Sequence, residues 1–100
     1  MDIPADSSLP TIRSAIDEID NGIVDLLGQR ARLIDRVAQL KRARGQPVRD
    51  PVRESAIMDR LRAAAQAAGV DPEVITGIYR LIFDEAVRRQ TSHAADDQCP

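Results

Sequence analysis

An apolar stripe with alternating spacings of four and three residues runs through the first half of the sequence. Its members are Ile12, Ile16, Ile19, Ile23, Leu26, Leu33, Val37 and Leu40. This spacing is typical of a seam along which one long helix packs against another. Arg30 interrupts the stripe, and a guanidinium is costly to bury unless an anion meets it. We therefore expect a negative group inside a helical assembly. The alternative is that Arg30 reaches the surface or pairs with a carboxylate from another helix.

The first predicted helix runs from roughly residue 8 to residue 43. Ser7 and Ser8 are both suitable N-caps, and Gly45-Gln46-Pro47 marks the stop. Two internal glycines weaken the helix locally, at about 1 kcal/mol each, but the apolar periodicity continues through both. The pattern therefore predicts one long helix.

Two shorter helices follow. Asp50-Pro51 and Asp71-Pro72 are two copies of one start signal, an N-cap followed by proline at the first helical position. The second helix is predicted to end at Gly69 and the third at about Gln90 or Ser92. We expect an all-α domain over residues 8–93, with disordered tails at 1–7 and 94–100.

The length of the first helix predicts the oligomeric state. A helix of this length spans ~54 Å, whereas a compact globule of 100 residues is only ~35 Å across. A single copy would expose the apolar stripe. The sequence therefore predicts an intertwined homodimer of three-helix protomers, most simply with the two long helices antiparallel about a two-fold axis.

The dimer would bring distant cations together. Arg13 lies ~26 Å from Arg30 along one helix, and Lys41 lies ~17 Å from Arg30 on the other side. If the two-fold axis passes near Val24, Arg13 of the partner subunit falls opposite residue 35. Three cations would then surround one spot, twice per dimer.

Other polar residues could complete such a pocket. Asp50 and Glu54 share one face at the start of the second helix. Plain N-capping is the alternative role for Asp50, and Arg53 and Glu54 could be ordinary solvent-exposed charges. Gln90 lies on the inner face of the third helix, where it is either a buried amide that needs partners or part of a wetted helix end.

Composition and charge argue against several classes of protein. A net charge of −2 gives no general positive field for nucleic acid, and the arginines at 32, 36, 42 and 44 are more typical of a solvated helix face. The acidic start does not resemble a signal peptide, and no apolar run is long enough for a membrane span. The single Cys99 allows no internal disulfide, which suits the cytoplasm. No metal-ligand spacing is present, so we expect no metal.

The ordered set of polar residues resembles the all-helical chorismate mutase family (AroQ type) over roughly residues 9–91. The stretches that carry the resemblance are Ile12-Arg13-x-x-Ile16-x-x-Ile19-Asp20, Leu26-Leu27-x-x-Arg30, Val37-x-x-x-Lys41, Pro47-Val48-Arg49-Asp50-x-x-Arg53-Glu54 and the late Gln90. A single element such as Arg53-Glu54 is a weak signal of the family, but the whole set of residues at these spacings is a specific one.

The resemblance implies a homodimer that rearranges chorismate to prephenate without a cofactor, on the route to phenylalanine and tyrosine. It implies that Arg30 and Arg13 of the partner subunit bind the substrate carboxylates. It also implies that Lys41 and Gln90 hydrogen-bond the ether oxygen of the substrate. Glu54, helped by Asp50, would bind the ring hydroxyl, and Arg53 would complete the cationic lining. Some members have a substrate-contacting serine where this chain has Ala86.

Two other functions remain open at this point. One is an isochorismate–pyruvate lyase on the same fold, which uses a similar set of cations and whose reaction is also an intramolecular pericyclic step. A helical dimerisation module would neutralise Arg30 with a carboxylate of its partner and would bind no ligand.

Overall fold

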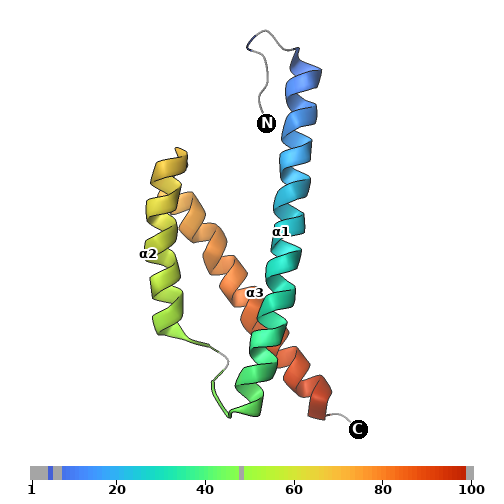
Figure 1. Cartoon of the computed structure of the whole chain (residues 1–100), viewed down its shortest axis with the longest axis vertical. Helices are drawn as coiled ribbons and strands as arrows, with labels where there is room; N and C mark the ends of the chain where they lie inside the picture. The colour runs from blue at the N-terminus through green and yellow to red at the C-terminus, as the bar shows by residue number, and fades with distance from the viewer. Residues whose placement is uncertain (1–4, 6–7, 48, 99–100) are drawn as a thin grey trace. The chain divides into compact units, whose positions relative to one another are not determined.

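The computed structural model describes residue 5, residues 8–47 and residues 49–98, with side chains up to residue 91. Three helices account for most of this part: α1 (Leu9–Ala43), α2 (Pro51–Ala68) and α3 (Pro72–Gln98), in the order shown in Figure 1. The predicted all-α class with a long N-terminal helix is confirmed. The chain divides into two compact units, Met1–Leu33 and Ile34–Pro100, and α1 contributes to both.

Helix α1 begins and ends where the sequence predicts. The Ser8 hydroxyl oxygen accepts a hydrogen bond from the Thr11 amide at 3.4 Å, whereas Ser7 lies outside the described residues. At the other end Gly45 has a φ of 66°, and the Gln46 amide donates to the Lys41 carbonyl at 2.9 Å. This left-handed turn satisfies carbonyls that the last helical turn leaves free. Neither internal glycine breaks the helix.

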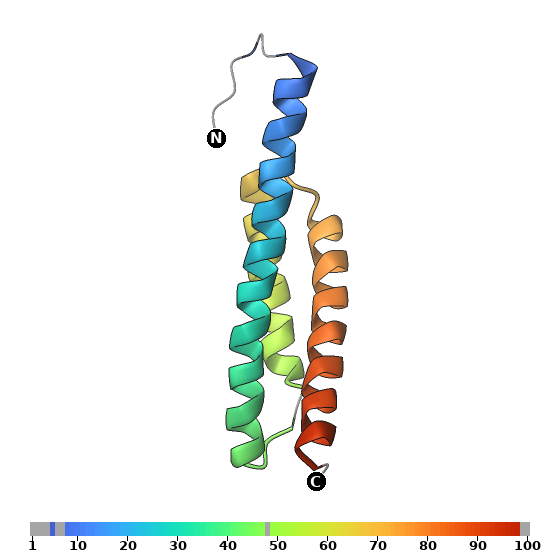
Figure 2. The same ribbon diagram turned by 90° about the vertical axis from the view of Figure 1, so that its right-hand side faces the viewer.

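Helices α2 and α3 pack against each other as an antiparallel hairpin in the second unit (Figure 2). The Asp50 carboxylate caps α2 by accepting from the Arg53 amide at 3.0 Å, and Asp71 accepts from the Glu73 amide at 2.9 Å. Gly69 ends α2 with a φ of 73°. A residue with a Cβ would be strained there, so glycine permits the tight turn between the two helices.

The core of the second unit combines an isoleucine and one aromatic ring with small side chains. Its buried members include Ile57 and Ala65 on α2 and Thr76, Phe83 and Ala86 on α3. Val74 and Ile78 are apolar residues of α3 that are exposed in the single chain.

Helix α3 is longer than predicted. The sequence places its end near Gln90 or Ser92, whereas the helix continues to Gln98. No glycine or proline lies between Gly77 and Pro100, so nothing in the chain forces an earlier stop, and Ala94 and Ala95 favour helix. The assigned tail at 94–100 is thus helical as far as Gln98, while most of residues 1–7 lie outside the described part. The domain limits at residues 8 and 93 stay a prediction.

The apolar stripe of α1 faces solvent in the single chain. Ile19 is 54% exposed, Ile23 51% and Leu26 63%. Isolated exposed apolar residues are common, but a continuous row of them along one helix marks a surface that another element covers. Among the described residues, no helix is long and apolar enough to cross a membrane.

Candidate active site

Two predicted site residues lie in the first unit. Arg13 is exposed near the start of α1, and Arg30 is half-buried four to five turns further along the same helix. The helix separates them by ~26 Å, so one small ligand cannot contact both in the same chain.

Lys41 and Gln90 belong to the second unit. Lys41 is half-buried in the last turn of α1, and Gln90 is 6% exposed on α3. The Gln90 side-chain oxygen is buried and has no hydrogen-bond partner among the described residues. The expectation of a buried amide is therefore confirmed, and the wetted helix end is not. A buried amide oxygen without a hydrogen-bond donor is costly.

Asp50 and Arg53 are both exposed at the start of α2. The hydrogen bond from the Arg53 amide to the Asp50 carboxylate shows that N-capping is at least one role of Asp50. The N-capping role that the sequence offered for Asp50 is therefore confirmed for one of its two carboxylate oxygens.

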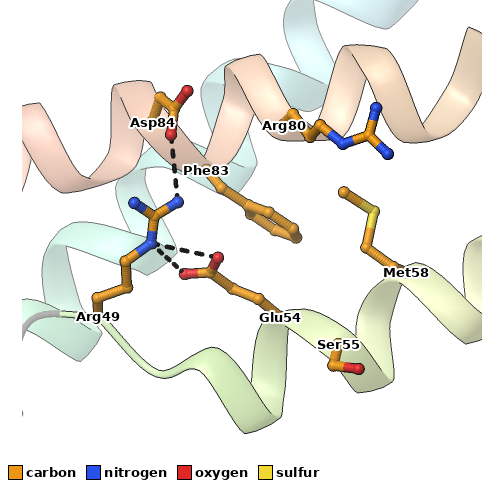
Figure 3. A pocket seen from close by; sticks show the side chains of 7 residues that line it. All are labelled: Arg49, Glu54, Ser55, Met58, Arg80, Phe83 and Asp84. Atoms are coloured by element: carbon orange, nitrogen blue, oxygen red, sulfur yellow. Dashed lines mark hydrogen bonds and ion pairs between the residues drawn. The ribbon is translucent and has the colours of Figure 1, made fainter.

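Glu54 is held by an arginine that the sequence did not single out. Arg49 Nε donates to both Glu54 carboxylate oxygens, at 3.3 and 3.0 Å, and Arg49 Nη2 donates to Asp84 Oδ1 on α3 at 3.1 Å. Figure 3 shows the guanidinium between the two carboxylates. The hydrogen bonds to Glu54 and then to Asp84 raise the pKa of Arg49 above its usual value.

This ion pair lies at one side of a pocket of about 320 Å³ between α2 and α3. Phe83 and Met58 form its apolar part, and Arg80 lines it from α3 on the side of Met58 (Figure 3). Ser55 completes the lining with Arg49, Glu54 and Asp84. The pocket therefore combines an apolar floor with charged groups of both signs.

A second ion pair connects α3 to the C-terminal part of α1. Arg89 Nη2 donates to Asp35 Oδ2 at 2.6 Å, and both side chains are partly buried. The hydrogen bond to Asp35 raises the pKa of Arg89, although desolvation acts in the opposite direction. Arg89 directly precedes Gln90 in the sequence, so the residue that makes this contact is the neighbour of the buried amide along α3.

Sequence reasoning missed these partner residues for a physical reason. Arg49 lies in the quoted Arg49-Asp50 stretch, but only the folded chain shows that its side chain reaches both α2 and α3. Asp84 and Asp35 are charges on amphipathic helices, where solvent exposure is the usual role. The one available signal was the basic residue directly before a helix N-cap.

Comparison with known proteins decides the family. The family described as chorismate mutase type II matches residues 12–91, a span that includes every predicted site residue. The chain belongs to this family. A chorismate mutase of Methanocaldococcus jannaschii is 34% identical over 90 residues, which cover 90% of this chain and 91% of that protein.

Some relatives of this chain are much longer proteins. The T-protein of Enterobacter agglomerans is 30% identical over 94 residues, or 94% of this chain but 25% of that protein. The chain therefore spans about a quarter of the length of that relative. Among solved structures, a chorismate mutase from Thermus thermophilus superposes with a TM-score of 0.76 at 25% identity, covering 83% of this chain and 93% of that one.

Proposed function

We propose that this protein catalyses the intramolecular rearrangement of chorismate to prephenate, a step of aromatic amino acid biosynthesis. The observation that carries the proposal is the family match over residues 12–91. A relative named chorismate mutase, aligned over nearly its full length, supports it. The matched range contains the positions of all the predicted cations and of the buried Gln90.

The active unit in this proposal is an intertwined homodimer. The exposed row of Ile19, Ile23 and Leu26 supports it, because a second copy of α1 would cover these side chains. Arg13 and Arg30 are too far apart along α1 to share a ligand within one chain. Arg13 of the partner subunit therefore joins Arg30 at each site, and the two guanidinium groups bind the two substrate carboxylates.

The chemical step needs few groups from the protein. The rearrangement is pericyclic: the ether C–O bond breaks as a new C–C bond forms within one molecule, with no external nucleophile, redox partner or proton transfer. The site must select the compact conformer of chorismate, in which the enolpyruvyl group lies over the ring. It must also stabilise the negative charge that grows on the ether oxygen as the C–O bond lengthens.

Lys41 and Gln90 supply that stabilisation. Lys41 places a fixed cation beside the ether oxygen, and Gln90 donates a hydrogen bond from its amide nitrogen. Gln90 is buried on α3, so its donor works in a region of low dielectric, where a fixed dipole is more effective than in water. A preorganised donor of this type typically lowers the barrier by ~3 kcal/mol.

The opposite end of the substrate meets the start of α2. Glu54 accepts a hydrogen bond from the ring hydroxyl, and Asp50 assists with the oxygen that does not cap the helix. Arg53 completes the cationic lining. Ala86 cannot provide the hydroxyl contact that a serine makes in some family members. The missing hydrogen bond weakens substrate binding by about 1 kcal/mol without changing the reaction.

One experiment tests the assignment. Purified protein is incubated separately with chorismate and with isochorismate, and the products are identified by chromatography. We expect prephenate from chorismate and no salicylate from isochorismate. Salicylate without prephenate would instead assign a lyase, and no product together with no thermal shift from chorismate would favour a dimerisation module.

A further inference from the structure

We infer that Arg49 is a positioning residue that holds Glu54 ready for the ring hydroxyl of the substrate, a role that rests on the function proposed above. Arg49 contacts no substrate in the proposed function. It follows from the contacts that Arg49 makes with two carboxylates on two helices.

The contacts fix the Glu54 carboxylate from one side. Arg49 Nε donates to both of its oxygens, at 3.3 and 3.0 Å. Each carboxylate oxygen has two lone pairs, so the group can still accept a hydroxyl proton from the other side. A charge-assisted hydrogen bond of this kind restricts the orientation of the carboxylate before the substrate arrives.

Arg49 is itself anchored to a second helix. Its Nη2 donates to Asp84 Oδ1 on α3 at 3.1 Å (Figure 3). Arg49 therefore links the first turn of α2 to the middle of α3. Both helices belong to the same compact unit and pack against each other, so the link has a fixed frame at both ends.

Glu54 needs such support. It lies in the first turn of α2, and its side chain is 24% exposed. A partly exposed glutamate has several rotamers, and ordering it on substrate binding costs free energy. An arginine that has already ordered it removes part of that cost, and substrate binding becomes tighter.

The chain offers a matched control in a different arginine. Arg62 donates to Asp59 at 3.3 Å within α2, in an exposed pair three residues apart. It resembles Arg49 in charge and exposure, but within the described part of the chain it connects no second helix. An exposed pair of this kind contributes little to stability or to binding.

The expected signature is in KM. Glu54 contacts a ring hydroxyl that is present in both the ground state and the transition state, so weakening that contact removes uniform binding. We expect Arg49→Gln to raise KM for chorismate by about fivefold, with kcat within about twofold of the unaltered protein. Arg49→Lys keeps the charge but cannot contact Glu54 and Asp84 through two separate nitrogens. We therefore expect its KM to lie between that of the unaltered protein and that of Arg49→Gln. Arg62→Gln leaves both constants unchanged.

The decisive experiment is a double-mutant cycle with Arg49→Gln and Glu54→Gln, read in KM and in thermal unfolding. If Arg49 acts through Glu54, Arg49→Gln changes KM by less than about twofold once Glu54 is replaced. The unfolding temperatures are then also non-additive, whether or not chorismate is bound.

The outcomes separate the inference from the function beneath it. An unaltered protein that makes no prephenate overturns the proposed function, and the inference falls with it. A protein that turns over chorismate normally, but in which Arg49→Gln leaves KM unchanged or raises it equally in the Glu54→Gln background, overturns the inference alone. Additive unfolding temperatures would contradict the Arg49–Glu54 contact directly.

Discussion

The replacement Gln90→Glu tests the proposed chemistry because it changes one donor into a group that donates only when protonated. The amide nitrogen of Gln90 donates at any pH, so the unaltered protein should show a flat rate profile across neutrality. A glutamate at this position would be an acceptor once ionised. It would then repel the charge that grows on the ether oxygen.

The burial of residue 90 sets the size of the effect. The side chain is 6% exposed, and burial raises the pKa of a carboxyl above its ordinary value of ~4.3. Above that pKa the protonated fraction falls about tenfold for each pH unit. Loss of one preorganised donor costs on the order of a hundredfold to a thousandfold in kcat. We therefore expect a loss of this size at pH 8 and a tenfold recovery for each unit of acidification, until the carboxyl is protonated.

The assay follows chorismate disappearance from pH 4.5 to pH 8.5. Gln66→Glu is the matched control because Gln66 is exposed on α2, and its profile should stay flat. Two results would refute the reasoning: a Gln90→Glu protein with a flat profile, or an unaltered protein with a sharp acid optimum. The first would show that residue 90 makes no contact with the developing charge.

Three further predictions follow from the same account. Arg30→Ala and Lys41→Ala should each remove most of kcat while sedimentation still shows a dimer; a variant with near-native kcat would contradict the assigned role. Asp35→Asn should lower the unfolding temperature by about 5 °C, and the exchanged pair Asp35→Arg with Arg89→Asp should recover part of that loss if the 2.6 Å contact is as described. Ile23→Asp should shift the protein to monomer in sedimentation and abolish activity, since it places a charge in the apolar seam; a stable, active dimer would rule out α1 as the interface.

Local signals were sufficient to predict the helices. Ser8, Asp50 and Asp71 act as N-caps through hydrogen bonds to amides within the next three residues, so their chemistry is visible in the sequence. Gly69 likewise ends α2 because a positive φ favours glycine. The end of α3 was missed because the residues after Gln90 carry no stop signal. Helix length then depends on weak propensities.

The contacts of the candidate site were less predictable. The sequence left two interpretations of Gln90 open, a buried amide or part of a wetted helix end, and its burial favours the first. The Arg49–Glu54 and Asp35–Arg89 pairs depend on which long, flexible side chains meet after packing. Helical periodicity gives the face of a charged residue but not its partner on another helix. The roles of the predicted site residues stay predictions for the same reason.

The central claim is that each site takes Arg30 from one subunit and Arg13 from the other, and subunit mixing tests it most directly. Arg13→Ala and Arg30→Ala proteins, each nearly inactive alone, are unfolded together, refolded and assayed for prephenate. Random pairing makes about half of the dimers mixed, and each mixed dimer has one intact site of two, so about a quarter of the unaltered activity should return. If the mixture is no more active than its two components, Arg13 of one subunit and Arg30 of the other do not share a site, and the account is wrong.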